Sequence, residues 1–204
     1  MKKSTILFSC LLGLSLLNSC KKDEDENTTP TASEPKAGST WVLRMTDLNE
    51  DGSIESTMDF HLLASDTSIQ GSNWLKLTRT EDQAVVSYFQ KRSDGWWKIN
   101  PGTSTPTLWI KDPAVVGESY TTLVTDGSVD TMKVVAVDQS ITVAAGTISN
   151  CLKIENYDTN SLEGVNYFNS NQGIFIYQEE YDEHTNGNPG MFTDYKMELV
   201  SFNP

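Results

Sequence analysis

The sequence predicts an all-β domain in which a single antiparallel, strongly curved sheet forms a half-barrel or a barrel-like structure. From residue 40 onward threonine, valine, tyrosine and tryptophan dominate, and no stretch has the pattern of a helix. Turn dipeptides recur between apolar runs, and such pairs favour the positive φ angles of tight hairpins. So many antiparallel strands in one domain must curl to hide their edges, and a β-sandwich is the alternative arrangement.

Each expected strand is an apolar or alternating run bounded by turn residues. Four of the connections are Asp51-Gly52, Asp94-Gly95, Asp126-Gly127 and Asn186-Gly187. The expected strands cover residues 41–47, 53–64, 73–79, 83–91, 95–99, 107–111, 118–125, 128–137, 140–145, 147–156, 162–169, 174–181 and 191–202.

Two of these runs predict which face is buried. In the last strand Tyr195, Met197 and Leu199 alternate with charged residues, which is typical of one buried and one solvated face. The run GIFIY over residues 173–177 is apolar on both faces. It therefore predicts a strand that lies centrally or lines a cavity.

The first 19 residues have the organisation of a signal peptide. Two lysines precede an uncharged run over residues 6–17, which is shorter than the roughly 20 apolar residues that span a bilayer. The segment Leu17-Asn18-Ser19-Cys20 then resembles the lipobox of bacterial lipoproteins, although Asn18 departs from the commonest pattern. The resemblance implies cleavage before Cys20 and acylation of its thiol. The alternative is an ordinary secreted protein that is cut near Ser19.

A charged segment follows the cysteine directly and cannot be buried, because clustered carboxylates have a large desolvation cost. It consists of Lys21, Lys22, Asp23, Glu24, Asp25 and Glu26. The segment resembles the lipoprotein export signal of Bacteroidota, which implies an outer-membrane lipoprotein displayed on the cell surface. A plain solvated tether on a periplasm-facing protein is the alternative. Residues 27–39 have two prolines and no large apolar residue, so we expect a disordered tether over 20–39 and one domain over 40–204.

Composition and cysteine content limit the classes of function. Removal of the first 19 of the 204 residues leaves 185 and takes away two lysines, which changes the formal charge from −13 to −15. Such acidity argues against binding to nucleic acid or to anionic lipid surfaces. Cys10 leaves with the signal peptide and Cys20 is expected to be acylated, so no intramolecular disulfide is expected. Cys151 lies between apolar stretches, where a small buried side chain is favoured over a nucleophile.

The second half of the chain contains three segments that together resemble many uncharacterised bacterial lipoproteins. ITVAAGTISNCLKIEN at residues 141–156 has a glycine turn followed by a strand that begins Cys-Leu-Lys-Ile. KDPAVVGESYTT at residues 111–122 and VNYFNSNQGIFIYQEEY at residues 165–181 are similar to the segments before and after it. The resemblance implies an antiparallel curved sheet, like the half-barrels of lipoprotein carriers, and no particular activity.

One loop is a candidate metal site. Asp47, Asn49 and Asp51 alternate as at the start of a calcium loop, and Glu55 supplies a further oxygen ligand. Ca²⁺ takes six to eight oxygen ligands, but Met58 stands where the loop's bidentate carboxylate is expected. An acidic hairpin turn is therefore the favoured interpretation, with Ca²⁺ as the alternative and no other cofactor expected.

Tryptophans are the candidate ligand-binding residues: Trp74, Trp96, Trp97 and Trp109. Trp96 and Trp97 are adjacent, so in a strand they point to opposite faces. Exposed tryptophan rings stack on sugars or line cavities, whereas core packing is the favoured interpretation. The sequence contains no catalytic or nucleotide-binding motif of the G-x-S-x-G, H-E-x-x-H, phosphate-loop or dinucleotide type.

Three hypotheses for the function remain, in decreasing order. The first is a non-enzymatic, lipid-anchored surface lipoprotein whose β-domain is structural or binds a glycan, a protein or another ligand. The second is a periplasm-facing carrier whose sheet shelters a lipid or other apolar ligand. The third is a hydrolase. An inward apolar cavity favours the carrier, and an exposed tryptophan platform favours the glycan binder. A buried carboxylate or histidine that lies in a cleft and has a shifted pKa favours the hydrolase.

Overall fold

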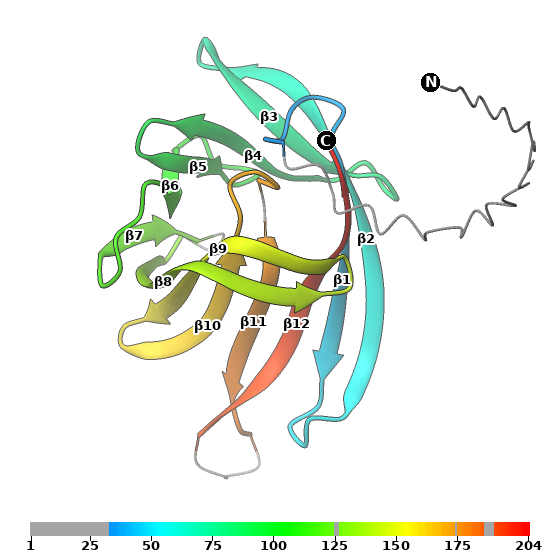
Figure 1. Ribbon diagram of the computed structural model, residues 1–204, viewed down its shortest axis with the longest axis vertical. Helices are drawn as coiled ribbons and strands as arrows, with labels where there is room; N and C mark the ends of the chain where they lie inside the picture. The colour runs from blue at the N-terminus through cyan, green and yellow to red at the C-terminus, as the bar shows by residue number, and fades with distance from the viewer. Residues whose placement is uncertain (1–32, 125–126, 174, 186–189) are drawn as a thin grey trace, which may run out of the picture.

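The computed structural model describes residues 33–124, 127–173, 175–185 and 190–204 (Figure 1). The predicted signal peptide, the acylated Cys20 and the export signal at residues 21–26 lie outside the described residues, as do Asp126 and Asn186-Gly187. No helix in the described part of the chain is long and apolar enough to cross a membrane. The strands are β1 (Thr40–Leu48), β2 (Ile54–Ile69), β3 (Ser72–Arg79), β4 (Val85–Arg92), β5 (Gly95–Ile99), β6 (Thr107–Lys111), β7 (Ser119–Leu123), β8 (Val129–Val143), β9 (Gly146–Asp158), β10 (Ser161–Phe168), β11 (Phe175–Glu183) and β12 (Met191–Asn203).

All twelve strands belong to one antiparallel sheet that curls into a nearly closed barrel. Their order is β6-β5-β4-β3-β2-β1-β12-β11-β10-β9-β8-β7. Each strand therefore pairs with its neighbours in the chain except at β6 and β7, which are the two ends of the order, and β1 also pairs with β12. The predicted all-β fold with a single curved sheet is confirmed, and the alternative of two stacked sheets is wrong.

In the described part of the chain the barrel has a gap between β6 and β7, and side chains bridge it. The hydroxyl of Tyr120 donates a hydrogen bond to the carbonyl oxygen of Trp109 at 3.0 Å. The Oγ1 atom of Thr107 accepts one from the amide of Leu123 at 2.9 Å. The two edge strands thus lie side by side without a backbone ladder, and their edges are shielded from pairing with another chain.

Aromatic contacts across the interior show how tightly the sheet curls. The ring of Trp96 on β5 lies 6.2 Å from that of Phe168 on β10, and the Trp109 ring on β6 lies 4.5 Å from that of Phe175 on β11. Strands from opposite ends of the sheet order therefore share one core, which is filled by large side chains from both halves of the chain.

The predicted strands 128–137 and 140–145 form the single strand β8, which is a correction to the sequence analysis. The register with β9 shifts three times between Val134 and Ile141, and Asp138 has a φ of 55°. Such bulges bend a strand without ending it. Figure 1 shows the β8–β9 hairpin crossing β10, β11 and β12, and the amide of Ala145 at its tip donates to the carbonyl of Leu199 on β12 at 3.0 Å.

The last residues of the predicted tether over 20–39 pack against the β-domain. Pro35 packs so tightly against Gly173 that a Cβ atom there would lie 1.7 Å from the proline ring. The amide of Gly38 donates to the carbonyl of Ala64 at 2.9 Å, and Glu34 forms an ion pair with Lys91. Residues 34–39 therefore belong to the packed part of the chain.

Candidate functional site

Strand register shows which side chains face the interior of the barrel. Leu43 pairs with Leu199, and Met45 pairs with Met197, so the predicted buried face of the last strand lies inside. Arg44 and its partner Glu198 point to the opposite, outer face. The alternation predicted for the last strand is confirmed.

An apolar chamber of about 230 Å³ lies on this inner face. Arg79 is its polar lining residue, and the Arg79 guanidinium is held by an ion pair with Asp82. A bulge in β4 leaves Val86 without a partner on β3, and this 45% exposed side chain marks the mouth of the chamber. The apolar lining residues are Leu43, Phe60, Leu62, Leu77, Val86, Phe89, Phe175 and Met197.

A second, polar chamber of about 110 Å³ lies beside the first. Phe175 lines both chambers, and the centre of the Trp109 ring between them lies 4.7 Å from that of Phe89 and 4.5 Å from that of Phe175, which it meets edge to face. Register pairs Phe89 with Lys98 and Met197 with Gln178, so residues of the two chambers share one face. The polar lining residues of this second chamber are Lys98, Thr122, Asp130, Asn156, Asn166, Gln178 and Glu180.

Buried amides organise the polar chamber. The Nδ2 atom of Asn166 donates to Oδ1 of Asn156 at 3.2 Å, and both residues are more than nine-tenths buried. The amide of Gln178 donates to the carboxylate of Glu180 and, at 3.1 Å, to the hydroxyl of Tyr195. Because buried polar groups are costly unless they are paired, this network fixes the orientation of each amide.

Burial shifts the pKa values of two charged side chains that line the polar chamber, Lys98 and Glu180. Burial lowers the pKa of Lys98, and the nearby Asp130 opposes that shift. Burial raises the pKa of Glu180; hydrogen bonds from Gln178 and Asn156 oppose the rise, and repulsion from Asp130 and Glu163 adds to it. The chamber thus holds one cationic side chain against two carboxyl groups.

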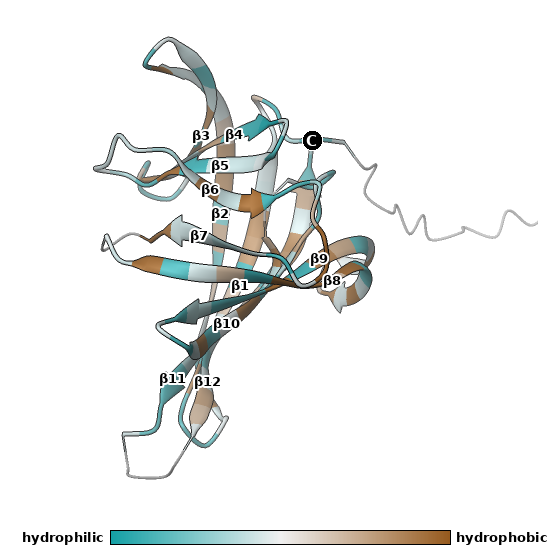
Figure 2. Ribbon diagram, turned by 90° about the vertical axis from the view of Figure 1, so that its left-hand side faces the viewer, coloured by the Kyte–Doolittle hydropathy of each residue, from teal (hydrophilic) through white to brown (hydrophobic). Residues whose placement is uncertain are grey.

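The end of the barrel next to this chamber is acidic. Burial raises the pKa of the Glu163 carboxyl, and repulsion from other acidic side chains raises it further; these are Asp158, Asp130, Asp182 and Glu183. Figure 2 shows hydrophilic residues gathered toward the ends of β10 and β11. The electrostatic field at this end therefore attracts cations.

The four candidate tryptophans do not form an exposed platform. Trp96 and Trp109 lie inside the barrel, where both rings contact Phe168. Trp74 and Trp97 lie on the outer face, where the Arg92 guanidinium is 5.5 Å and 4.3 Å from their ring centres. Trp96 and Trp97 thus point to opposite faces as predicted, and Trp74, Trp96 and Trp109 are buried.

The calcium candidates form the turn of the β1–β2 hairpin. Asp51 accepts hydrogen bonds from the backbone amide and the hydroxyl of Ser53, and Asp47 accepts one from Ser56. Asn49 donates to the Ser53 hydroxyl, and Glu55 is exposed. Asn49 and Asp51 thus meet at the Ser53 hydroxyl. The described residues hold no cluster of three or more acidic, histidine or cysteine side chains fit for a metal ion.

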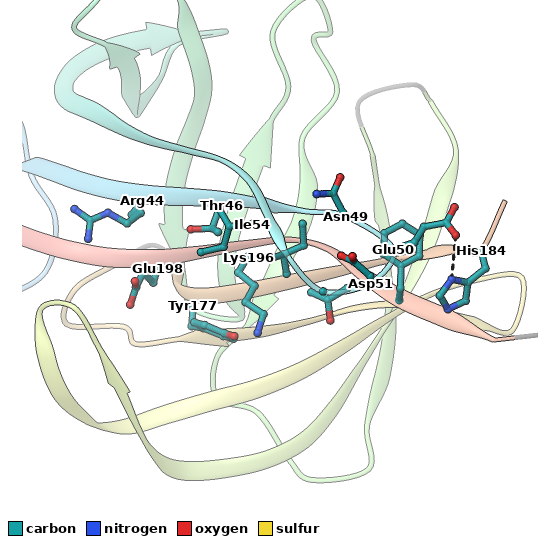
Figure 3. A pocket seen from close by; sticks show the side chains of 14 residues that line it. Arg44, Thr46, Asn49, Glu50, Asp51, Ile54, Tyr177, His184, Lys196 and Glu198 are labelled. Atoms are coloured by element: carbon teal, nitrogen blue, oxygen red, sulfur yellow. Dashed lines mark hydrogen bonds and ion pairs between the residues drawn. The ribbon is translucent and has the colours of Figure 1, made fainter. Parts of the chain in front are cut away.

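A wider pocket of about 580 Å³ lies on the outer face of β1, β11 and β12 (Figure 3). Its charged side chains already have partners. Arg44 forms two hydrogen bonds with Asp59, at 2.8 Å and 3.0 Å, and Lys196 lies 3.4 Å from Glu179. Figure 3 shows the contact between Glu50 and His184, which measures 3.4 Å. This pocket is a polar hollow on the outer face, whereas the two chambers lie on the inner face of the sheet.

Cys151 is fully buried, as the sequence analysis predicts. Burial raises the pKa of its thiol to about 11, so the reactive thiolate is scarce at neutral pH. Its sulfur lies 3.6 Å from the carbonyl oxygen of Ile148, within the core rather than at a cleft. This residue therefore packs as a small apolar side chain.

Sequence reasoning missed the residues of the polar chamber, namely Lys98, Asp130, Asn156, Asn166, Gln178 and Glu180. One signal was present in β11, where Gln178 and Glu180 have the same parity and alternate with Tyr177, Glu179 and Tyr181. Polar residues at both parities of a strand indicate a polar patch on the inner face. Comparisons with protein-family models, with curated proteins and with solved structures found no match.

Proposed function

We propose that this protein is a non-enzymatic, lipid-anchored outer-membrane lipoprotein whose barrel shelters an apolar ligand. The anchor rests on the lipobox-like segment ending at Cys20, and surface display rests on the acidic tract that follows it. A periplasm-facing carrier is the alternative location for the same binding activity.

The inward apolar chamber is the observation that carries the binding function. Eight of its nine lining residues are apolar, and they come from six different strands. Its volume of about 230 Å³ is below the roughly 300–1,000 Å³ of pockets that enclose drug-sized ligands. The chamber therefore takes the apolar part of a ligand, while the remainder lies outside it. Because the tryptophans form no exposed platform, the structure favours this binding mode over glycan stacking.

One observation favours a hydrolase, the half-buried carboxyl of Glu180 with its raised pKa. Its hydrogen-bond donors are the amides of Gln178 and Asn156, which are neither nucleophiles nor bases. A chamber of about 110 Å³ also leaves little space for a scissile bond together with attacking water. Ligand binding is therefore the function that the geometry supports better.

Fluorescence of N-phenylnaphthylamine, an apolar probe, tests the proposal. The mature chain carrying Cys20→Ala needs no detergent, and we expect it to bind the probe saturably. Val86→Phe places a larger side chain at the mouth of the apolar chamber and is expected to weaken binding about tenfold, which corresponds to about 1.4 kcal/mol.

The matched control is Val116→Phe, the same replacement at an exposed valine that does not line the chamber. It is expected to leave probe affinity unchanged. Absence of saturable binding, or equal loss in both variants, would contradict the proposed function.

A further inference from the structure

We propose that the polar chamber binds the ammonium group of an amphiphilic amine whose apolar part occupies the neighbouring apolar chamber. This inference rests on the proposed function, because it assigns the polar end of the same ligand. Phe175 lines both chambers, so a single molecule that passes this ring reaches both.

The size of the polar chamber favours a small group as its occupant. At about 110 Å³ it is far smaller than pockets that enclose whole ligands, which measure roughly 300–1,000 Å³. A compact ammonium group meets this limit, whereas a sugar or a phosphodiester head group requires more space.

The charges of the chamber favour a cation. Lys98 lies near Asp130, whose charge stabilises the protonated amine. Glu180 is a second carboxyl group, and its hydrogen-bond donors are the neutral amides of Gln178 and Asn156. Glu180 is half-buried, and partial removal of a carboxylate from water has a cost, so a ligand ammonium beside Glu180 would compensate it.

Aromatic rings supply the second element of such a site. Trp109 and Phe175 line the chamber, and the Lys98 ammonium already lies 5.8 Å from the Trp109 ring centre. Ammonium groups are attracted to aromatic faces at such distances, most strongly where water is excluded. Rings together with a carboxylate are a lining that recognises amines rather than anions.

The lack of a side chain at Gly164 leaves space for the Glu180 carboxylate in the wall of the polar chamber. A Cβ atom at this position would lie 2.8 Å from Oε2 of Glu180 and 2.8 Å from Oδ1 of Asn156. Its backbone is not in the left-handed region, so glycine is required here for space and not for conformation. The carboxylate therefore occupies a place that any larger residue would close.

Competition among three amphiphiles of equal chain length tests the inference. Decylamine, decanol and decanoate are titrated against N-phenylnaphthylamine bound to the mature Cys20→Ala chain. We expect decylamine to displace the probe at a concentration about tenfold lower than decanol does, because one charge-assisted hydrogen bond provides about that gain in affinity. Decanoate is expected to be the weakest competitor. Glu180→Gln is expected to reduce the advantage of the amine to less than about twofold while the probe still binds.

Lys98→Met serves as the second variant, because it removes the competing cation and is expected to increase the advantage of the amine. Equal displacement by all three compounds, or preference for decanoate, would overturn the ammonium assignment and leave the proposed function standing. Failure of the probe itself to bind would overturn both. The ranking in the chain with native Glu180 and Lys98 does not depend on the folding of either variant.

Discussion

A single glycine illustrates how one residue determines the shape of the interior. Gly164 lies on β10 between neighbours that fill the polar chamber, and an added methyl group would meet the carbonyl oxygen of Glu179 at 2.4 Å. Backbone atoms cannot move aside as the end of a flexible side chain can. The cost of a larger residue therefore falls on the sheet itself and on the amide network around Asn156.

We expect Gly164→Ala to lower the free energy of unfolding by about 1–3 kcal/mol, the usual cost of overpacking a close-packed site. Urea denaturation of the mature Cys20→Ala chain measures this change. Ser161→Ala, at an exposed position of the same strand, is the control and is expected to change stability by less than about 0.5 kcal/mol. A Gly164→Ala variant as stable as the control would show that the sheet relaxes freely here.

Among the elements, β6 and β7 are the strands on which closure of the barrel depends. Other neighbouring strands are joined by backbone ladders, whereas these two meet through side chains such as Tyr120 and Thr107. Burial also raises the pKa of the Tyr120 hydroxyl, which keeps it protonated and able to donate to the Trp109 carbonyl. This contact adjoins the aromatic wall between the two chambers.

Tyr120→Phe removes this hydroxyl and is expected to lower the free energy of unfolding by about 1 kcal/mol. It is also expected to speed hydrogen exchange at the amide of Leu123, which donates to Thr107 across the gap. Tyr88→Phe is the control, since the Tyr88 hydroxyl makes no hydrogen bond within the described residues. Equal stability and equal exchange in the two variants would mean that the gap is held by packing alone.

For the whole molecule, the relation between anchor and barrel matters most. The chain reaches the domain at residues 34–39, which pack beside Gly173 and Lys91. Acyl chains contribute about 0.8 kcal/mol per buried methylene, so two or three chains hold such a protein firmly at a membrane. If Cys20 is acylated as proposed, the binding site would stay close to a bilayer, from which amphiphilic ligands partition.

We expect protease added to intact cells to digest the protein, because the acidic tract is proposed to direct it to the surface. Neutralising Asp23, Glu24, Asp25 and Glu26 to their amides is expected to protect it, and Cys20→Ala is expected to release it from the membrane. Immunoblotting before and after permeabilisation of the outer membrane measures accessibility. Protection of the unaltered protein until permeabilisation would contradict surface display and leave the periplasmic carrier.

Local patterns were enough to predict most of the strands. Turn chemistry at Asp51-Gly52 and Asp94-Gly95 and alternation along residues 191–202 depend on neighbouring residues alone. The same reasoning failed where the signal was weaker. β2 continues to Ile69, beyond the predicted end at residue 64, because Gln70 and Gly71 form a turn with φ angles of 51° and 79°.

The chambers were outside the reach of such reasoning, because they depend on how the sheet curls. Lys98, Asn166 and Glu180 lie far apart in the chain and meet through strand order, register and bulges, none of which is a local property. The sequence by itself determined the all-β class and the positions of most strands. Tertiary structure alone decided which tryptophans are buried and which polar side chains face inward, since burial and charge pairing arise only when distant strands close around one interior.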